Sequence, residues 1–586
     1  MNKMTLLLVP AFLLSFSFAM ASQDIAAGWG SPDIRYPREF DGNDVFKGTL
    51  SLKNTVSLVA WKGETVQAQA VVACMAGKTD SIAVRATSLS RTGGRGRTVI
   101  PASVLRTGFV GYVMTDELNR DGSGGCGYRN SADFDSSYVA DPIDHISAYR
   151  PLEEKSLQPV WLSIDVPRDI PAGVYAGNVE VYAGAERCVS LPLRLTVRDR
   201  EMPQENIFHL DLWQNPYAVA RYYGVEPFSR EHLALMEPVM KLYADAGGKV
   251  ITASIAHWPW NAQTFDPFES MVTWLRKADG TWWFDYTVFD IWVEFMMSLG
   301  VTDQINCYSM IPWKLSFQYL DQASNSFRYL SAAPGDPEYE QFWTVMLRSF
   351  ASHLREKGWF DITMIAMDER PMDQMLAAVE VIKNADPDFR IAFAGNCHGQ
   401  LLDVLDYYCI PIGSEYPEGT VEKRRSEGKV TTLYTCCTEA WPNTFTFSRP
   451  AEAEWIGWYV AANGLDGYLR WALNSWPEDP VHDSRFTAWA AGDTYLVYPD
   501  GMSSIRFERL KAGITAYRKI AALRDEFSST GNKKGLASLD KALSLFVMPD
   551  KDRIREITSD HDYSGLSGED PAADAIVSAR RILDRL

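Results

Sequence analysis

Hydrophobic and polar residues alternate along the first third of the chain. The stretches "LVAWKGETVQAQAVVAC" and "LQPVWLSIDVP" place apolar residues at alternate positions, which is typical of strands with one buried face. "RDIPAGVYAGNVEVYAG" joins Gly and Pro turn chemistry to a further strand pattern. We therefore predict an all-β sandwich domain over residues 22–203, which ends in the charged segment 198–206.

The pattern changes after residue 204. Short apolar runs then alternate with longer amphipathic stretches, such as "YEQFWTVMLRSFASHLREKG" and "MDQMLAAVEVIKNA". The runs lie at residues 208–214, 249–257, 305–310, 364–369, 391–396, 407–411, 430–437 and 467–474. This repetition predicts a (β/α)8 barrel of the TIM type over residues 204–526. An open, doubly wound sheet is the alternative, and it is disfavoured because no glycine-rich phosphate loop follows any of the runs.

The two ends of the chain carry further segments. Residues 1–21 resemble a secretory signal, with Lys3, an apolar stretch and a small-x-small cleavage site at residues 19–21. This predicts an exported protein, periplasmic or secreted, with a membrane anchor as the less favoured alternative because Pro10 interrupts a short run. No later segment has the length of a membrane span. Helical patterns near residues 535–546 and 571–585 predict a short helical C-terminal extension over residues 527–586.

The net charge and the cysteine spacing disfavour two classes of ligand, nucleic acid and thiolate-bound zinc. Fifty-seven basic and 75 acidic residues give a net charge of −18, which disfavours nucleic acid as a partner. The eight cysteines include no CxxC pair, so a thiolate zinc site is not expected. Some cysteines could pair after export, but the sequence leaves the pairing open. We predict no metal and no cofactor, and the oligomeric state stays open.

Adjacent carboxylates follow the fourth apolar run. "MIAMDERP" places Asp368 and Glu369 where a barrel strand would end, and catalytic groups of barrels gather at these ends. Pro371 cannot continue a strand, so the chain turns and both side chains could reach one pocket. Two such acids suit glycosidic cleavage, in which one carboxyl donates a proton and the other stays ionised. The alternative interpretation is a helix cap at Asp368 and a surface ion pair at Glu369.

Neighbouring carboxylates are poorly spaced for an attack by one of them on the sugar. They fit better a mechanism in which the substrate's own 2-acetamido oxygen attacks the anomeric carbon. The first carboxylate would then orient the amide and stabilise the cyclic oxazolinium, and the second would act as acid and then as base.

Aromatic and polar residues gather at the other predicted strand ends. Sugar rings stack on indoles and their hydroxyls bind to polar side chains, so these residues are candidates for substrate binding. The alternative for any single Trp is core packing, and the two histidines could be satisfied polar residues without metal-like spacing. The candidates are His257, Asn396, His398, Trp441, Trp471, Asn474 and Trp476, with Glu415, Tyr416 and Glu439 as weaker ones.

Several motifs resemble glycoside hydrolase family 123. "MIAMDERP", "GYLRWALNSWPEDP", "AGDTYLVYPDG" and "SIRFERL" are similar to its catalytic domain, and "AWKGETVQAQAVV" and "PVWLSIDVPRDIPAGVYAGNVEV" resemble its β-sandwich. The resemblance implies a retaining β-N-acetylgalactosaminidase that uses substrate-assisted catalysis. It implies that Asp368 stabilises the oxazolinium and that Glu369 is the general acid/base.

The predicted function is release of terminal β-linked N-acetylgalactosamine from glycans or glycolipids. The nearest alternative is β-N-acetylglucosaminidase activity by the same mechanism, since the two sugars differ only at the C4 hydroxyl. A carbohydrate-binding protein without catalysis and a hydrolase with a nucleophile of its own are further alternatives.

Overall fold

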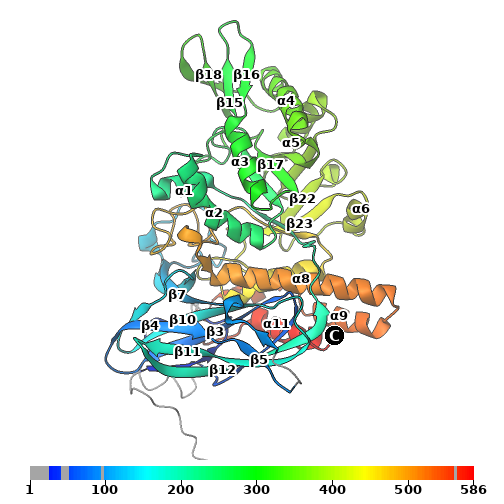
Figure 1. The fold of residues 1–586 in the computed structure, drawn as a ribbon. Helices are drawn as coiled ribbons and strands as arrows, with labels where there is room; N and C mark the ends of the chain where they lie inside the picture. The colour runs from blue at the N-terminus through cyan, green and yellow to red at the C-terminus, as the bar shows by residue number, and fades with distance from the viewer. Residues whose placement is uncertain (1–24, 41–49, 51, 94–97, 560–563) are drawn as a thin grey trace, which may run out of the picture.

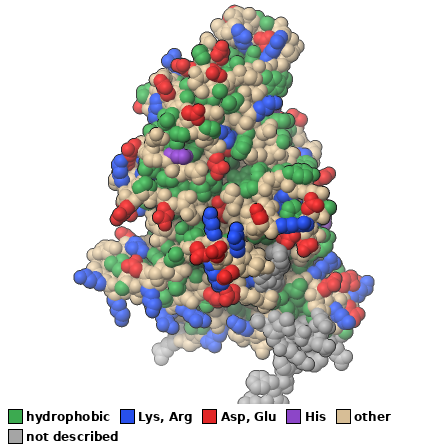
Figure 2. All heavy atoms as spheres, turned by 180° about the vertical axis from the view of Figure 1, so that it is seen from behind, with side chains coloured by type: hydrophobic (Ala, Val, Ile, Leu, Met, Phe, Trp, Pro, Cys, Tyr) green, Lys and Arg blue, Asp and Glu red, His purple; other side chains and the backbone are tan. Residues whose placement is uncertain are grey.

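The computed structural model describes residues 25–40, 50, 52–93, 98–559 and 564–586. The predicted signal segment, residues 1–21, lies outside these ranges. Figure 1 shows a β-sandwich at the bottom, a barrel above it and a small sheet at the top. Figure 2 shows acidic, basic and apolar side chains interspersed over the rear face, with apolar side chains gathered across its middle.

Two sheets form the predicted sandwich. One has the strand order β1 (Ile25–Gly30), β3 (Thr65–Cys74), β10 (Ser156–Asp165), β7 (Leu105–Thr115), β8 (Ser137–Asp144) and β25 (Ser503–Ser504). The other contains β2 (Val56–Lys62), β12 (Glu186–Glu201), β11 (Gly173–Ala183), β4 (Thr79–Ala86), β9 (Arg150–Leu152), β5 (Leu89–Arg91) and β6 (Val99–Ile100). Alternate residues of both sheets, such as Leu162 and Leu193, share one apolar core.

Eight parallel strands form a nearly closed barrel. Their spatial order is β13 (His209–Leu212), β24 (Gly467–Arg470), β23 (Val430–Thr435), β22 (Tyr407–Pro411), β21 (Arg390–Ala394), β20 (Thr363–Met367), β17 (Gln304–Tyr308) and β14 (Val250–Ser254). The first and last of these approach at one point, where the Lys249 N–H donates to the Leu210 carbonyl at 2.9 Å. All eight predicted runs are therefore barrel strands, and the order excludes the doubly wound alternative.

Helices surround the barrel and extend beyond it. They are α1 (Pro216–Tyr223), α2 (Arg230–Asp245), α3 (Thr287–Ser298), α4 (Pro337–Lys357), α5 (Met372–Ala385), α6 (Thr420–Ser426), α7 (Pro450–Ala462), α8 (Ile505–Ser529), α9 (Lys533–Leu543), α10 (Lys551–Thr558) and α11 (Pro571–Leu583). Local signals set their ends: α4 begins at a proline and ends at Gly358, whose φ of +73° suits glycine. None of the helices in the described ranges has the length and apolar character needed to cross a bilayer.

A four-stranded sheet at the top of Figure 1 was not expected from the sequence. It has the order β16 (Trp282–Asp285), β15 (Thr273–Arg276), β18 (Ser316–Asp321) and β19 (Ser326–Ser331), and we call it the accessory sheet. Its strands come from the two long loops that follow β14 and β17, and a parallel pairing of β15 with β18 joins these loops. Its inner face packs on α4, where Trp274 stacks on Phe342 at 4.3 Å.

The sandwich and the barrel share a buried polar joint. Asp141 of β8 accepts hydrogen bonds from Arg35 at 2.9 Å, from Arg506 of α8 at 2.9 Å and from the Tyr498 hydroxyl at 2.7 Å. Burial raises the pKa of Asp141, but the charges of Arg506 and Arg35 outweigh it and hold that pKa below its usual range. The helix α8 lies between the two domains (Figure 1), so this joint ties the barrel to the sandwich.

A disulfide makes a second link between the domains. It joins Cys126, between β7 and β8 of the sandwich, to Cys437, just beyond barrel strand β23, across a sequence separation of 311 residues. Backbone hydrogen bonds reinforce it, since Gly125 donates to the Cys437 carbonyl at 2.6 Å. The sandwich loop is thereby fastened to the barrel rim, and the pairing that the sequence left open is resolved for these two cysteines.

A carboxylate is buried inside the barrel itself. Asp211 of β13 is fully buried, and its Oδ2 accepts a hydrogen bond from the Asn306 amide of β17 at 3.4 Å. Burial raises the pKa of Asp211 to about 7. The folded chain therefore holds a proton on this side chain at pH values where the unfolded chain has lost it.

Removing the disulfide should destabilise the protein. We expect the double variant Cys126→Ser/Cys437→Ser to lose about 2–5 kcal/mol of unfolding free energy, because the unfolded chain gains conformational freedom. Chemical denaturation measures this loss. A reducing agent provides the control, since it should lower the denaturation midpoint of the wild type and leave that of the double variant unchanged. Equal midpoints for both proteins, with and without the reducing agent, would contradict the prediction.

Asp211 should make stability depend on pH. Because its folded pKa is raised from 3.8 to about 7, the stabilising effect of its bound proton is complete below about pH 4 and is lost as the pH rises to about 7. Asp211→Asn should therefore gain stability relative to the wild type over this window, by up to about 4 kcal/mol. Denaturation at pH 5 and pH 8 measures the difference between the two proteins; a difference that does not change with pH would show that Asp211 does not titrate in this way.

Candidate functional site

The adjacent carboxylates stand where β20 leaves the barrel sheet. The ladder to β21 ends with the pair Met367 and Phe393, and Asp368 is the next residue. Asp368 is buried, with 8% of its surface exposed, whereas Glu369 is exposed. The α5 helix begins at Met372, so both carboxylates lie in the turn between strand and helix.

Asp368 lies between an indole and a guanidinium. The Trp313 indole nitrogen, from the loop after β17, donates to Asp368 Oδ2 at 3.3 Å, and Arg370 Nη2 lies 3.0 Å from Oδ1. The Arg370 guanidinium also lies over the Trp313 ring at 4.5 Å and donates to the Ile311 carbonyl at 2.7 Å. Burial raises the pKa of Asp368, the Arg370 charge opposes this rise, and the nearby Glu369 carboxylate adds to it.

Glu369 has a different partner. The Tyr434 hydroxyl, from the end of β23, donates a hydrogen bond to Glu369 Oε1. Burial and the Glu369 charge raise the pKa of Tyr434, so the phenol keeps its proton and remains a donor. One acid is thus buried beside a cation, and the other is exposed and held by a neutral donor. Such a pair can divide the roles of charge stabiliser and proton donor.

Three of the predicted binding residues lie at the rim of the barrel. His257 follows β14, and its Nδ1 lies 2.7 Å from Glu269 Oε2. Asn396 and His398 follow β21, where the Tyr408 hydroxyl donates to the Asn396 carbonyl and accepts from the His398 N–H, both at 2.7 Å. These contacts fix the backbone of the loop after β21 and leave the roles of the two side chains as predictions.

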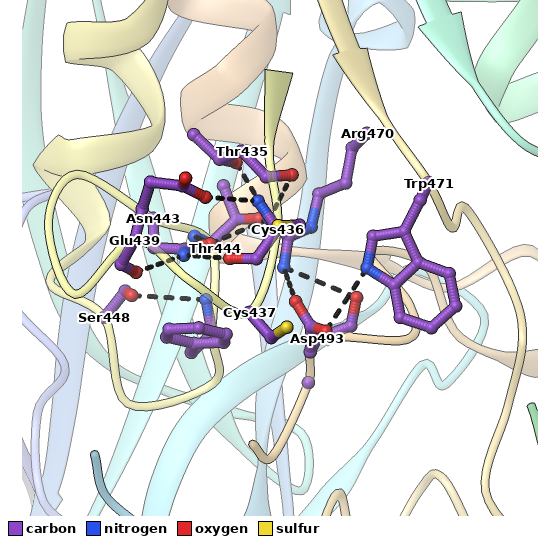
Figure 3. A network of polar contacts seen from close by, with 12 residues as sticks. Thr435, Cys436, Cys437, Glu439, Asn443, Thr444, Ser448, Arg470, Trp471 and Asp493 are labelled. Atoms are coloured by element: carbon purple, nitrogen blue, oxygen red, sulfur yellow. Dashed lines mark hydrogen bonds and ion pairs between the residues drawn. The ribbon is translucent and has the colours of Figure 1, made fainter. Parts of the chain in front are cut away.

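Trp471 belongs to a polar network in the loops after β23 and β24, shown in Figure 3. Its indole nitrogen donates to Asp493 at 3.2 Å, and Asp493 forms a fully buried ion pair with Arg470 at 2.6 Å. Arg470 also donates to Asn443 at 2.7 Å. Glu439 closes the network because it accepts from the Cys436 N–H at 2.7 Å, and burial raises the pKa of Glu439. The network joins the loops that follow β23 and β24.

The other three predicted binding residues are buried. Trp441 packs against Trp455 of α7 at 4.9 Å, and Trp476 donates to the Val497 carbonyl at 2.8 Å. Asn474 donates to the Asn215 carbonyl at 2.8 Å and accepts from the Asn215 N–H at 2.9 Å. Their contacts in the structure are with the protein itself, so their part in substrate binding stays a prediction.

Sequence reasoning missed the partners of the two acids. Trp313 and Tyr434 contact Asp368 and Glu369, and both lie just beyond or at the end of a predicted strand. An aromatic residue at such a position was a signal, but 19 Trp and 26 Tyr occur in the chain. Only the arrangement of strands around the barrel distinguishes these two from the rest.

Within the described ranges, His, Cys, Asp and Glu side chains form no group of three or more that could hold a metal ion. The polar contacts of the acid pair are instead with Trp313, Arg370 and Tyr434.

Comparisons with known proteins agree with this arrangement. Residues 213–523 match the family described as "Glycoside hydrolase 123, catalytic domain", and residues 29–183 match "Glycoside hydrolase 123 N-terminal domain". No curated protein sequence matches the chain.

The solved structures include one with the same overall fold. It is a family 123 glycoside hydrolase from Clostridium perfringens, described in terms of glycolipid glycan hydrolysis, with a TM-score of 0.82 and 27% sequence identity over 96% of this chain and 100% of that chain. A family 39 glycoside hydrolase from Bacteroides cellulosilyticus WH2 has 13% identity, covers 70% of this chain and 81% of that chain, and has a TM-score of 0.33, which is too low to indicate a shared fold.

Proposed function

Since this chain belongs to glycoside hydrolase family 123 and is therefore a glycoside hydrolase, we propose that it releases a terminal β-linked N-acetylgalactosamine by substrate-assisted catalysis. The observation that supports this most is the acid pair at the end of β20, in which Asp368 is buried beside Arg370 and Glu369 is held by Tyr434. The two environments match two different chemical roles.

In the proposed first step, the acetamido oxygen of the substrate attacks the anomeric carbon. The bond to the leaving oxygen breaks, and Glu369 transfers its proton to that oxygen. Asp368 accepts a hydrogen bond from the acetamido N–H and balances the positive charge of the oxazolinium. Because Asp368 is buried, water screens this charge interaction weakly.

In the second step, water opens the oxazolinium. Glu369 takes a proton from the water as the oxygen of the water bonds to the anomeric carbon, and the acetamido group is restored. Two inversions at the same carbon give net retention. The Tyr434 hydroxyl supports both steps because it fixes the direction of the Glu369 carboxyl group.

The substrate class follows from the same family. The Clostridium perfringens relative is described in terms of glycolipid glycan hydrolysis, so we propose that the natural substrate is a glycan or glycolipid with a terminal β-linked N-acetylgalactosamine. The signal-like residues 1–21 support export of the enzyme, which would bring it to such substrates.

Three aryl glycosides test the proposal. Para-nitrophenyl 2-acetamido-2-deoxy-β-galactoside should be hydrolysed, whereas its gluco epimer and the β-galactoside without the acetamido group should not. Hydrolysis of the gluco epimer would make the enzyme a β-N-acetylglucosaminidase. Turnover without an acetamido group would indicate a nucleophile from the enzyme, and binding without any turnover would indicate a carbohydrate-binding protein.

Glu369→Gln should reveal the proton donor. We expect the variant to lose about 10²- to 10⁴-fold in kcat/KM on an alkyl glycoside, whose leaving group needs a proton. The loss should be much smaller on a dinitrophenyl glycoside, which leaves without protonation. The comparison needs the rates of wild type and variant on both substrates, and an equal loss on both would remove Glu369 from the role of acid.

Arg370 should set the acid side of the pH profile. Its charge opposes the rise in the pKa of Asp368, so Arg370→Gln should raise that pKa further. Asp368 would then be protonated at a higher pH, and kcat/KM should begin to fall at a higher pH than in the wild type. Arg370→Lys is the matched control because it keeps the charge; identical acid limbs in wild type and the Gln variant would contradict the assignment of Asp368.

A further inference from the structure

An exposed indole on the loop after β14 is held in a fixed orientation. Trp258 follows β14, and the residue is 38% exposed although its indole nitrogen donates to Glu269 Oε1 at 2.9 Å. One side of the ring stacks on His257, with 4.9 Å between centroids and 22° between planes. Glu269 binds both residues through its two oxygens, so His257, Trp258 and Glu269 form a cluster that hydrogen bonds hold together.

The backbone at this point is strained. Trp258 has a φ of +51°, a left-handed conformation that is costly for a bulky residue and that is one of the forms of strain found at active and ligand-binding sites. Two backbone hydrogen bonds hold it there: its N–H donates to the Phe268 carbonyl at 2.9 Å, and its carbonyl accepts from Asn261 at 3.0 Å. The folded protein thus keeps a large aromatic face in solvent although the backbone conformation of this residue is strained.

This cluster is continuous with the acid pair on one side. The backbone N–H of Trp313 donates to the carbonyl of Pro259, the residue after Trp258, at 3.0 Å. The indole nitrogen of the same Trp313 donates to Asp368, and its ring is 51% exposed. Two exposed indoles therefore lead outward from the buried carboxylate.

On the other side the cluster meets the accessory sheet. The Tyr329 ring of β19 lies 6.3 Å from the His257 ring and is 56% exposed. The Gln318 amide of β18 donates to the Tyr329 hydroxyl at 2.7 Å, which holds the ring on the outer face of the sheet. Aromatic faces and hydrogen-bonding edges alternate along this path, as a saccharide requires.

We propose that Trp258 and Tyr329, with His257 and Glu269 as polar edges, form a second sugar-binding surface for the part of the glycan beyond the cleaved bond. The inference rests on the proposed function, because an enzyme that removes a terminal sugar at Asp368 and Glu369 must let the remaining chain lead outward. A saccharide ring would stack on the open face of Trp258, and its hydroxyls would bind to the polar edges.

A lipid surface is the competing occupant of this region. The outer face of the accessory sheet carries a row of apolar residues from all four strands, in which Trp283 and Phe327 are exposed at the two ends. Exposed Trp and Phe suit a membrane interface. We favour the saccharide because the path from Tyr329 to Asp368 is edged by the polar groups of His257 and Glu269, whereas the row itself lies farther from the acid pair along the strands.

Variants at the two ends of this path test the proposal. The measured quantity is the ratio of kcat/KM on a soluble trisaccharide with terminal β-N-acetylgalactosamine to kcat/KM on the aryl glycoside. We expect Trp258→Ala and Tyr329→Ala to lower this ratio by about fivefold or more, mainly through KM, because stacking contributes to binding. Trp258→Phe should restore part of the ratio, since it keeps an aromatic face, and Trp283→Ala is the matched control on the same sheet.

The outcomes separate the alternatives. An unchanged ratio in both the Trp258 and the Tyr329 variants would overturn the proposal. The proposal would also be overturned, in favour of lipid contact, if the variants lost kcat/KM only on a glycolipid in phosphatidylcholine vesicles and Trp283→Ala lost it equally. If the wild type fails to hydrolyse the aryl glycoside, the proposed function fails by itself. The surface can then still be tested by calorimetry. This measures how tightly the trisaccharide binds to the Glu369→Gln protein with and without the Trp258→Ala substitution.

Discussion

The geometry of the candidate site depends on one constraint, which is the end of the β20 ladder at Met367. Within a strand, neighbouring side chains must point to opposite faces, so adjacent carboxylates could not serve one reaction. Beyond the strand the chain turns, and the two acids meet different partners: Asp368 meets Arg370 and Trp313, and Glu369 meets Tyr434. The partners come from the loop after β17 and the end of β23, so the order of the strands around the barrel is needed to assemble them.

The loops around this point are held by interactions that reach far along the chain. The buried pair of Arg470 with Asp493 joins the loops after β23 and β24, and a buried ion pair that lost one partner would leave an uncompensated charge. The Cys126–Cys437 disulfide fastens a sandwich loop to the segment just beyond β23, the strand that carries Tyr434. The sandwich therefore stabilises these loops at two points, because Asp141 of β8 binds Arg506, which in turn donates to the Thr444 carbonyl in the loop after β23 at 2.7 Å.

The accessory sheet also depends on contacts between segments that are distant in the sequence. Its strands are short and lie within two loops, so each loop alone has few local signals of a sheet. The parallel pairing of β15 with β18 exists only because β14 and β17 are neighbours in the barrel and bring the loops together. Trp258 and Tyr329 lie at the junction of this sheet with the rim, which is why the proposed glycan surface could not be derived from sequence spacing.

The sequence alone determined the two-part architecture, all eight barrel strands and the positions of Asp368 and Glu369, because these depend on local periodicity and on where an apolar run ends. It could not determine which aromatic residues lie near the acids. Trp441 and Trp476 stand just beyond predicted strands and yet are buried, whereas Trp258 and Trp313 occupy similar positions and are exposed. The tertiary structure decided this, since exposure and the pairing of Cys126 with Cys437 depend on contacts between segments that are distant in the chain.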